Sequence, residues 1–402
     1  MFEIKSKNIV SLLGNRSIII QNSEIFQFLV SKFFLELSNK IFKDPKFKKY
    51  PDIISYAFWI REGNLANIKK SYNVKNELYI GRGLVFHVVP SNVPTNFIYS
   101  LTFGLLSGNS NIIKLPEKNF IQIDLLLGLI QKILKNKNFI KLKNNMMFLR
   151  YNKKHHDITK YISLNSDVRI VWGGDKTVME IKKFPTKPTA IDINFPDKYS
   201  LCIIDTNDLK INFKKLVNNF YNDTFLYDQN ACSSPHLVLW YGKKTYEFKK
   251  IFWNELSKIV KLKYDFPRIN NLEKLEKKFF DQSSLTKNIK IYDVNKILMI
   301  ATFSKLIQNI DTYRGKWGYF YEHDLKNLRE INKICNSKFQ TLTFFSDKKS
   351  DLFKFLKKNY FSGISRIVPV GSALEMNLNW DGNDIIRILS KKIQKELNDK
   401  IK

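Results

Sequence analysis

The feature that most constrains the fold is a strand–loop–helix–strand pattern within residues 83–115. The run GLVFHVV at 83–89 is rich in β-branched and aromatic residues and ends at Pro90, which is typical of a buried strand. A polar loop follows, residues 97–107 have the composition of a helix, and NIIKL at 111–115 indicates a second strand. Two strands joined through a helix are the unit of a parallel sheet, so this segment predicts an α/β fold.

The same alternation continues along the chain, which is long enough for two ordinary domains. Apolar residues at intervals of three and four predict an amphipathic helix over 24–43, with Ser23 as its cap. Further helices are expected at 54–70, 121–135, 157–165, 208–221, 244–261 and 270–285, and further strands at 144–151, 168–174, 199–205 and 236–242. The last segment predicts a loop that ends at Asp381 or Gly382 and then a terminal helix.

The net charge of +30 raises the question of a nucleic-acid partner. Only ten of the 67 basic residues are arginine, the side chain most used for bidentate contacts to phosphates and bases. The lysines are scattered along the chain rather than gathered in one arm. We therefore interpret the charge as solvated surface that also attracts polyanionic substrates such as a nucleotide or coenzyme A, and we expect no nucleic-acid partner.

Cysteine usage and hydropathy predict a cytoplasmic protein. Cys202, Cys232 and Cys335 form no CxxC pair and no metal-ligand spacing, so no metal site is expected. A sparse, odd number of cysteines suits a reducing compartment. The N-terminus carries Glu3 within its apolar residues, and the apolar stretch at 96–115 contains Asn, Ser and Gly throughout. These features predict neither a secretory signal nor a membrane span.

Two loops stand where a nucleotide binds in an open α/β sheet, at the carboxyl ends of predicted strands. They are PSNVPTN at 90–96 and WGGDKTV at 172–178. Neither contains GxGxxG, and the chain has no GxxxxGK[ST], so the common dinucleotide and P-loop fingerprints are absent. Gly173 and Gly174 would let a backbone approach a pyrophosphate, although a simple turn is the commoner explanation of such a pair.

Cys232 lies in the segment YNDTFLYDQNACSSPH, residues 221–236. A free cysteine is most often a small buried hydrophobe. Here the neighbouring residues are polar, and the two serines that follow would leave backbone N–H groups accessible to activate a thiol and stabilise an oxyanion. From these residues alone, both interpretations of Cys232 stay open. Cys202 lies between apolar residues in a predicted strand and is expected in the core.

Candidate groups for moving a proton are few. His87 lies inside a predicted strand and is expected to be a hydrogen-bonded core residue. His236 follows the cysteine loop closely, a position from which it would influence the thiol. Glu322 and His323 in FYEHDL, with the aspartate after them, form a mixed acid–base cluster. Such a cluster usually marks an exposed helix start, but this one is also the best distant candidate for proton transfer.

Three longer segments resemble the LuxC family, the fatty acyl-CoA reductases of bacterial bioluminescence and their non-luminous relatives. They are residues 83–120, 227–240 and 366–393, which occur in the order of the family and together span most of the chain. The LuxC family is a branch of the aldehyde dehydrogenase superfamily. The resemblance therefore implies an α/β, aldehyde dehydrogenase-like fold with a Rossmann-like nucleotide-binding domain, an α/β catalytic domain and a small oligomerisation element.

The same resemblance implies a domain order. We expect a nucleotide-binding domain with the N-terminal helices over 1–195 and a catalytic domain that carries Cys232 over 196–372. Residues 373–402 would return to the nucleotide-binding and oligomerisation region. A homo-oligomer is expected.

Site residues follow from the resemblance one position at a time. Cys232 matches the catalytic cysteine that becomes acylated. Asn92 matches the asparagine whose side-chain amide forms an oxyanion hole with the backbone N–H of the cysteine. The positions that match cofactor contacts are Pro90, Ser91, Lys114, Glu117, Gly173 and Gly174, of which Lys114 and Glu117 correspond to the pair that holds the adenosine ribose.

Two departures from the superfamily pattern bear on the reaction. Hydrolytic aldehyde dehydrogenases have a water-activating glutamate where this chain has Asn194, in INFPDKYS. The absence of that base fits an enzyme that exchanges an acyl group with a thiol instead of water. A carboxylate at Glu117 would repel the 2′-phosphate of NADPH. The LuxC family uses NADPH, so NADPH is the expected cofactor and NADH the alternative.

The expected function is NADPH-dependent reduction of a long-chain acyl-CoA or other acyl thioester to the aldehyde, through an acyl-cysteine intermediate. Acyl-CoA or an acyl carrier would be the substrate, and an acyl-protein synthetase is the expected partner. Two alternatives stay open. One is an acylating aldehyde dehydrogenase for a short or sugar-linked acyl group, and the other is a basic binding protein without catalysis.

Overall fold

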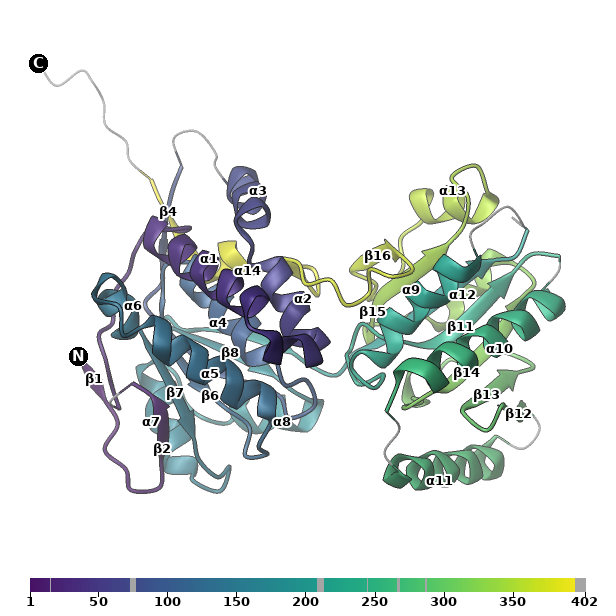
Figure 1. Ribbon diagram of the computed structural model, residues 1–402, viewed down its shortest axis with the longest axis horizontal. Coiled ribbons are helices and arrows are strands. Elements are labelled where there is room, and N and C mark those ends of the chain that lie inside the picture. The colour runs from purple at the N-terminus through teal and green to yellow at the C-terminus, as the bar shows by residue number, and fades with distance from the viewer. Residues whose placement is uncertain are drawn as a thin grey trace, which may run out of the picture. The chain divides into compact units, whose positions relative to one another are not determined.

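The computed structural model describes residues 1–14, 16–72, 77–207, 213–243, 245–265, 268–285 and 288–394. Two compact units share the chain (Figure 1). Unit 1 consists of Met1–Pro196 and the described residues from Leu378 on, and unit 2 consists of Asp197–Asn377. The chain thus leaves unit 1 once and returns to it once, and each unit is built around a sheet of its own.

The sheet of unit 1 has six strands in the order β2-β7-β6-β5-β8-β9. Five of them run parallel, and β2 is antiparallel at one edge. Their bounds are β2 Val10–Leu13, β5 Leu84–Val88, β6 Ser110–Lys114, β7 Met146–Arg150, β8 Val168–Trp172 and β9 Ile191–Phe195. All residues of β5 and β8 are buried, as expected for parallel strands covered on both faces.

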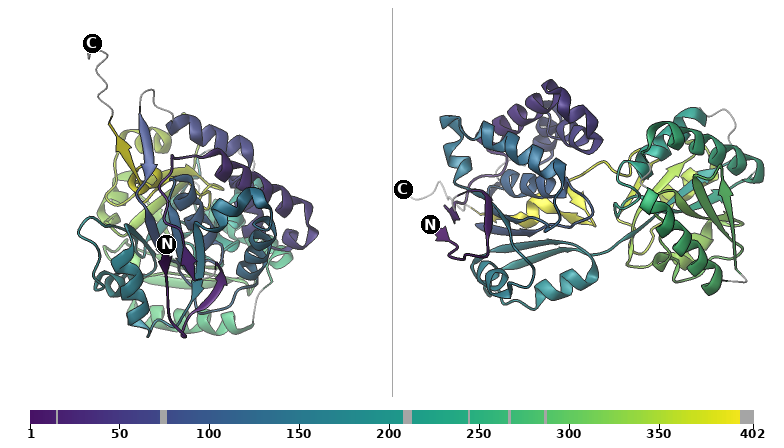
Figure 2. Two further views of the ribbon diagram at one scale, coloured as in Figure 1. Left: turned by 90° about the vertical axis from the view of Figure 1, so that its left-hand side faces the viewer. Right: turned by 60° about the horizontal axis from the view of Figure 1, so that its bottom comes forward.

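Helices cover both faces of this sheet (Figures 1 and 2). On one face, apolar side chains of α7 His156–Asn165 and α8 Asp175–Lys182 pack on the strands. On the other, α4 Asn96–Leu106 packs on β5 and β6, and α1 Phe28–Lys43 contacts α4 and α5 Ile121–Ile133. This arrangement of parallel strands and crossover helices confirms the α/β fold expected from the sequence.

The N-terminal helices differ from the prediction in two places. The helix expected over 24–43 begins only at Phe28, and Ser23 does not cap it, because the Ser23 hydroxyl donates to Gly108 O. The helix expected over 54–70 is two helices, α2 Pro51–Trp59 and α3 Glu62–Tyr72. The first helix ends at Ile60, where the Asn64 side chain donates to Trp59 O at 2.6 Å and so satisfies a carbonyl at the end of α2.

The C-terminal segment also differs from the prediction. In place of a long terminal helix, α14 Ile385–Leu389 is a single short helix. It is followed by β19 Ser390–Ile393, which pairs antiparallel with β4 Leu78–Gly81. The physical reason is that Asn109, which is buried, donates from its side chain to Leu389 O, so this carbonyl bonds to unit 1 rather than to a next helical turn.

The sheet of unit 2 has seven strands in the order β12-β13-β14-β11-β10-β15-β16. All are parallel except β12, which pairs antiparallel with β13 at an edge. The strand bounds are β10 Tyr199–Asp205, β11 Pro235–Tyr241, β12 Ile289–Val294, β13 Leu298–Phe303, β14 Tyr319–Leu325, β15 Phe339–Phe345 and β16 Arg366–Pro369.

Two apolar clusters, one on each face, hold this sheet to its helices. One includes α9 Phe213–Phe225 and α10 Thr245–Lys263, and the other includes α13 Asp351–Lys358. Cys202 is fully buried in the first cluster, which confirms its expected core position. Helix α11 Arg268–Ser284 corresponds to the helix expected over 270–285. Of the helix expected over 208–221, residues 208–212 lie outside the described part.

The acid–base cluster FYEHDL is not the exposed helix start that was expected. It forms strand β14, and Glu322 is fully buried in it. Both oxygens of Glu322 accept hydrogen bonds: Oε2 from the indoles of Trp240 and Trp253, at 2.9 and 2.8 Å, and Oε1 from Thr302 at 2.7 Å. A carboxylate whose lone pairs are taken up in this way belongs to the core, because the neighbouring donors replace its hydration.

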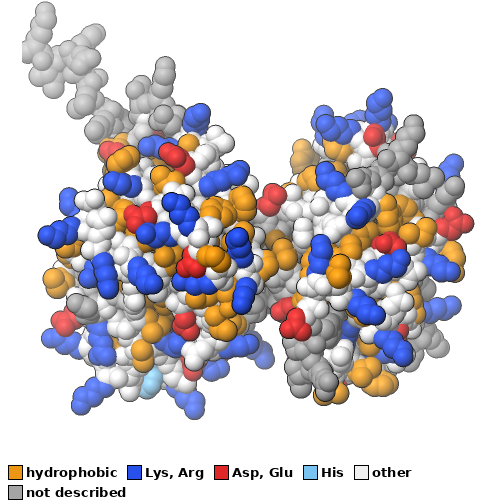
Figure 3. Space-filling model, viewed as in Figure 1, with side chains coloured by type: hydrophobic (Ala, Val, Ile, Leu, Met, Phe, Trp, Pro, Cys, Tyr) orange, Lys and Arg blue, Asp and Glu red, His pale blue; other side chains and the backbone are white. Residues whose placement is uncertain are grey.

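The smaller elements complete the chain. They are β1 Phe2–Glu3, β3 Ser17–Ile18, α6 Ile140–Lys143, α12 Ile331–Ile334, β17 Asn379–Trp380, β18 Asn383–Asp384 and the 3-10 turns Pro45–Lys49, Lys137–Phe139, Ile310–Thr312 and Leu328–Glu330. Within the described ranges, no helix has the length and hydropathy needed to cross a membrane. Lys and Arg side chains are spread over the visible face of both units (Figure 3).

Candidate functional site

The sheet of unit 1 reverses its order between β5 and β8, because β6 and β7 lie on one side of β5 and β8 and β9 on the other. In open α/β sheets, ligands bind in the crevice at such a switch point, outside the carboxyl ends of the strands. Every cofactor position named from the sequence follows a carboxyl end at this edge: Pro90 and Ser91 after β5, Lys114 and Glu117 at and after β6, and Gly173 and Gly174 after β8. Asn92 lies in the same loop as Pro90.

Lys114 and Glu117 belong to one small polar group at this edge. Lys114 is half-buried, and its ammonium lies 4.9 Å from the ring centroid of Tyr151. Burial lowers the pKa of Lys114, while the nearby charge of Glu117 raises it. The Glu117 carboxylate accepts from Asn152 Nδ2 at 2.6 Å and from Lys153 N at 2.9 Å, so it is exposed yet fixed by the loop that follows β7.

The two glycines after β8 play different parts. Gly173 N donates to Phe195 O at 3.2 Å, and a Cβ at Gly173 would come within 3.1 Å of the Thr177 side chain. Gly174 precedes the first turn of α8 and is exposed, and a Cβ built there meets no atom within 4 Å. Gly173 therefore permits close packing inside the loop, whereas Gly174 leaves open space in front of the helix.

A buried hydrogen-bond network lies beneath this edge of the sheet. Trp172 Nε1 donates to Ser100 Oγ at 3.0 Å, and the Asn111 side chain donates to Asn109 O at 2.8 Å. Between these fixed ends, Ser100 Oγ lies 2.7 Å from His87 Nδ1 and Asn111 Oδ1 lies 3.0 Å from His87 Nε2. The ends assign the tautomer: Ser100 donates to Nδ1, and Nε2 donates to Asn111.

His87 is therefore a satisfied core histidine, as expected. It is fully buried, and this burial lowers its pKa to about 4, which keeps the ring neutral near pH 7. This hydrogen-bond network links β5, α4 and β8 close to the loops at 90–96 and 172–178. Nothing in the sequence pattern singles out Ser100, because its partners lie 13 and 72 residues away.

Asn194 ends up at the same edge, in the second-last position of β9. Its Oδ1 atom is buried and has no hydrogen-bond partner among the described residues. The next residue, Phe195, stacks on Trp172 with ring centroids 3.8 Å apart. A buried acceptor without a donor is unusual in a native protein and is commonly explained by a missing ligand or water.

Cys232 lies in unit 2, in the loop that joins α9 to β11. The thiol-bearing residue is half-buried, unlike the fully buried Cys202. Its carbonyl accepts from Ser200 Oγ at 2.7 Å, and Ser200 Oγ in turn accepts from Thr341 N at 3.1 Å. The loop thus meets the amino-terminal ends of β10 and β15, the opposite kind of edge from the one used in unit 1.

His236 is close to Cys232 in sequence, but the structure gives it another task. Its Nδ1 atom donates to Gly315 O at 3.0 Å, and its ring stacks on Tyr199. Burial, reinforced by the charge of Arg314, lowers the pKa of His236 to about 3. The ring therefore stays neutral near pH 7, and its Nδ1–H is taken up by Gly315 O.

Asp223, at the end of α9, was not identified from the sequence. It is 1% exposed, and its carboxylate accepts from Gly371 N at 2.7 Å and from Ala373 N at 2.9 Å. The Arg366 guanidinium holds the carbonyls of the same turn, and Ser234 Oγ donates to Asp223 O at 2.8 Å. Asp223 therefore joins Ser234, which follows Cys232 closely, to the turn after β16.

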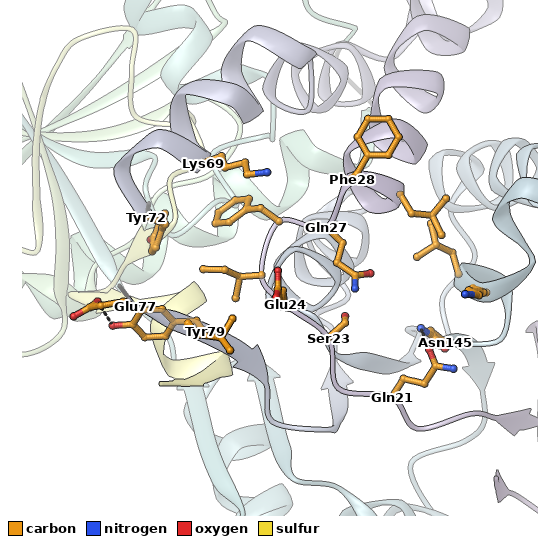
Figure 4. Close-up of a pocket in the computed structure, with 16 residues that line it drawn as sticks. Gln21, Ser23, Glu24, Gln27, Phe28, Lys69, Tyr72, Glu77, Tyr79 and Asn145 are labelled. Atoms are coloured by element: carbon orange, nitrogen blue, oxygen red, sulfur yellow. Dashed lines mark hydrogen bonds between the residues drawn. The ribbon is translucent and has the colours of Figure 1, made fainter. Parts of the chain in front are cut away.

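A cavity of about 650 Å³ lies elsewhere in unit 1 (Figure 4). Its walls come from the start of α1, the end of α3, β4 and the residues just before β7, with Lys69, Gln27 and Asn145 on different sides. None of the residues named above as candidate site residues lines it. Within the part of the chain that the structure describes, no cluster of His, Cys, Asp and Glu has the geometry of a metal site.

Comparison with known families and proteins gives a consistent result. Residues 64–390 match the family model described as "Acyl-CoA reductase (LuxC)". A long-chain acyl-protein thioester reductase of Photorhabdus laumondii is 25% identical over 298 residues, which is 72% of this chain and 58% of the relative. The same-named protein of Aliivibrio fischeri is 24% identical over the same shares. The chain thus spans about 58% of the length of these curated relatives.

Solved structures resemble the chain in fold. Aldehyde dehydrogenase 21 of Physcomitrella patens has a TM-score of 0.66 at 10% identity and covers 91% of this chain and 84% of its own. A 1-pyrroline-5-carboxylate dehydrogenase mutant of Thermus thermophilus has a TM-score of 0.64 at 10% identity, with 90% and 80% covered. The expected aldehyde dehydrogenase-like fold is therefore confirmed.

Proposed function

Because the chain belongs to the LuxC family of acyl-CoA reductases, we propose that it reduces a long-chain acyl thioester to the aldehyde with NADPH, through an acyl group carried on Cys232. The observation that carries this proposal is the contrast among the cysteines. Cys202 is sealed in the core, whereas Cys232 is half-buried in a loop whose backbone is fixed by Ser200. A partly exposed cysteine whose backbone is held in place suits a nucleophile.

In the proposed reaction, the Cys232 sulfur attacks the carbonyl carbon of the acyl thioester and the donor thiol leaves. The Asn92 side-chain amide and the Cys232 backbone N–H would stabilise the negative charge on the carbonyl oxygen. A bound nicotinamide would supply the hydride that, together with a proton, converts the enzyme thioester to a thiohemiacetal. Its collapse would break the C–S bond and give the aldehyde and the free Cys232 thiol. Asn194 cannot activate water as a carboxylate would, which favours transfer of the acyl group over its hydrolysis.

A nicotinamide cofactor would bind at the carboxyl edge of unit 1 and supply the hydride. Two observations support the fit: open space in front of Gly174 at the start of α8, and the buried Asn194 Oδ1 atom that lacks a donor. Gly173 and Gly174, with Pro90 and Ser91, would line the pyrophosphate side. Lys114 and Glu117 would hold the adenosine ribose. NADH is the alternative because Glu117 is a carboxylate.

The acyl donor would be acyl-CoA or an acyl carrier. The relatives' name, long-chain acyl-protein thioester reductase, supports a protein-bound acyl group. An acyl-protein synthetase would then supply it. A homo-oligomer in the cytoplasm completes the proposal.

The test is acylation of the intact protein. We would incubate it with acyl-CoAs of increasing chain length, digest it and measure the mass of the Cys232 peptide. We expect an acyl adduct there, and its removal by NADPH with release of one aldehyde per adduct. Cys232→Ala should lose both signals. An adduct that persists in this variant, or a reaction restricted to short acyl groups, would contradict the proposal.

Cys335→Ala is the matched control. Cys335 is also half-buried and lies in the same unit, but burial raises its pKa to about 12, which disfavours the reactive thiolate. This variant should acylate like the unmodified protein.

A further inference from the structure

The Cys232 loop contains a buried glutamine in an unusual backbone conformation. Gln229 is 1% exposed and has a φ of 57°, directly after Asp228 with a φ of 55°. The left-handed backbone conformation is unfavourable for residues other than Gly, Asn and Asp, so Gln is unexpected at this position. Tyr264 helps to hold the first of the two residues, because its hydroxyl donates to the Asp228 carboxylate. Gln229 is held by its backbone N–H, which donates to Thr224 O at 2.7 Å, and by its side chain.

Both ends of the Gln229 amide are hydrogen-bonded to one neighbouring segment. Its Oε1 atom accepts from Gly318 N at 2.7 Å, and its Nε2 atom donates to Tyr319 O at 3.3 Å. The donor and the acceptor belong to two consecutive residues, Gly318 and Tyr319, at the entry to β14. A primary amide is the side chain that pairs with both at once, because it offers an acceptor and a donor side by side.

These contacts fall on the β11 side of β14, before the ladder between these two strands begins, whereas on its other side Tyr319 already pairs with Met299 of β13. The ladder between β11 and β14 begins only at Leu237 and Tyr321. Two residues earlier in β11 is Pro235, which has no N–H to donate. Gln229 therefore attaches the Cys232 loop to β14 ahead of the ladder, and Trp317 N, which donates to Asp228 O at 3.5 Å, adds a weak contact beside it.

We propose that Gln229 is a positioning residue for Cys232. It holds the loop on the entry to β14 three residues before the cysteine, while Ser200 fixes the cysteine carbonyl from the other side. The role of Cys232 as the acylated nucleophile rests on the proposed function. The attachment of the loop by Gln229 does not, so the two can be tested separately.

Gln229→Glu gives a test with a built-in switch. A protonated carboxyl group has the same pattern as the amide: its C=O accepts from Gly318 N and its O–H donates to Tyr319 O. An ionised carboxylate cannot donate, and it would be buried next to a carbonyl oxygen. Burial favours the neutral form, so the variant should keep the loop in place at low pH and release it as the pH rises.

Two rates are measured from pH 5.5 to 8.5, each divided by that of the unmodified protein at the same pH. The first is acyl transfer from acyl-CoA to Cys232. We expect it to match at low pH and to fall at least about tenfold at high pH, because acyl transfer needs a fixed nucleophile. The second is alkylation of the Cys232 peptide by iodoacetamide. We expect it to rise several-fold over the same range as the loop is released.

Two further variants complete the design. Gln229→Gly keeps the left-handed backbone without strain but removes the side-chain amide. At every pH it should therefore show the rate ratios that Gln229→Glu shows at high pH. If Gln229→Glu unfolds at high pH, the rates of Gln229→Gly decide whether the amide positions Cys232. Gln282→Glu places the same change on the exposed face of α11 and should behave like the unmodified protein.

The outcomes separate the two hypotheses. If both rate ratios for Gln229→Glu are independent of pH and Gln229→Gly matches the unmodified protein, Gln229 does not position the loop. If the unmodified protein accepts no acyl group at all, the proposed function fails. The alkylation ratios then still decide whether Gln229 holds Cys232.

Discussion

The two units place their candidate site residues at opposite kinds of sheet edge. In unit 1 the residues follow the carboxyl ends of β5, β6 and β8, whereas in unit 2 Cys232 precedes the amino-terminal end of β11. The first arrangement is the general one for ligand sites in open α/β sheets. The second has no such rule behind it, and each side of the loop is fixed by a separate tertiary contact.

This difference shows how far the candidate site of each unit depends on residues distant in the sequence. In unit 1 the strand order brings the candidate residues to one edge, and their loops directly extend buried strands that Ser100 links through His87 and Trp172. The cysteine loop needs Ser200, Asp223 and Gln229, which bond to backbone groups 141, 150 and 89 residues away. We therefore expect small changes in unit 1 to affect ligands and small changes in unit 2 to affect the geometry of the thiol.

The largest effect is expected for Asn92→Ala. Loss of one oxyanion donor typically lowers the rate by about 100- to 1,000-fold. Both acylation of Cys232 and reduction of the acyl group should slow, because each passes through a charged oxygen. Single-turnover rates of the two half-reactions measure this, and cofactor titration by fluorescence provides the control, since cofactor affinity should not change. A defect confined to cofactor affinity would show that Asn92 belongs with Pro90 and Ser91 instead.

The sequence predicted the four central strands of the unit 1 sheet, β5 to β8, but not its edge strands β2 and β9, for a physical reason. Buried parallel strands are near-continuous apolar runs. The runs at 83–89 and 168–174, interrupted only by His87 and Arg169, stand out between polar loops, and β5 and β8 lie within them. Local signals were less reliable where tertiary contacts decide. Serine is a common residue at a helix N-cap, but the Ser23 hydroxyl donates to Gly108 O instead. No spacing in the sequence indicates that partner.

The cysteine loop shows the same limit more strongly. Its polar residues suggested accessible backbone, yet Gln229 and Asp223 are almost fully buried. FYEHDL was misassigned for a related reason, since the charges that suggested a surface are compensated by Trp240, Trp253 and Thr302 from other elements. Polar residues that are buried with their partners cannot be told from exposed ones by composition.

A second prediction concerns the pH dependence of the contacts that Asp223 makes with Gly371 N and Ala373 N. Burial raises the pKa of Asp223 to about 7, although Gly371 N, Ala373 N and the charge of Arg366 oppose this, and Glu375 adds to it. The native state therefore binds this proton more tightly than the unfolded chain does. The stability that this proton contributes is present in full below about pH 4 and is lost as the pH rises to about 7.

Asp223→Asn removes this titration. Relative to the variant, the unmodified protein should lose up to about 1.4 kcal/mol of stability per pH unit within that window. Hydrogen exchange in urea, followed on peptides of unit 2, measures the difference. Asp52→Asn in unit 1 is the matched control, because burial raises the pKa of Asp52 to about 6, so its effect should end one pH unit earlier and appear in unit 1 peptides. A constant difference between the unmodified protein and Asp223→Asn would contradict the prediction.

The smallest effect is expected for Glu117→Ser. Removing a carboxylate from the ribose position should favour NADPH over NADH by about tenfold, which corresponds to about 1.4 kcal/mol. Because Glu117 also accepts from Asn152 and Lys153, affinity for both cofactors should fall slightly as that loop loosens. The ratio of the kcat/KM values for the two cofactors isolates the local charge from this common loss.

Glu180→Ser is the control for net charge, since it removes an exposed carboxylate from α8 in the same unit. Long-range attraction of a more basic protein for the extra phosphate would change the ratio in both variants alike. A change in Glu117→Ser alone would place this carboxylate beside the ribose 2′ position. An unchanged ratio in both would mean that Glu117 only fixes the loop after β7, and the ribose contact would then have to be sought at Lys114.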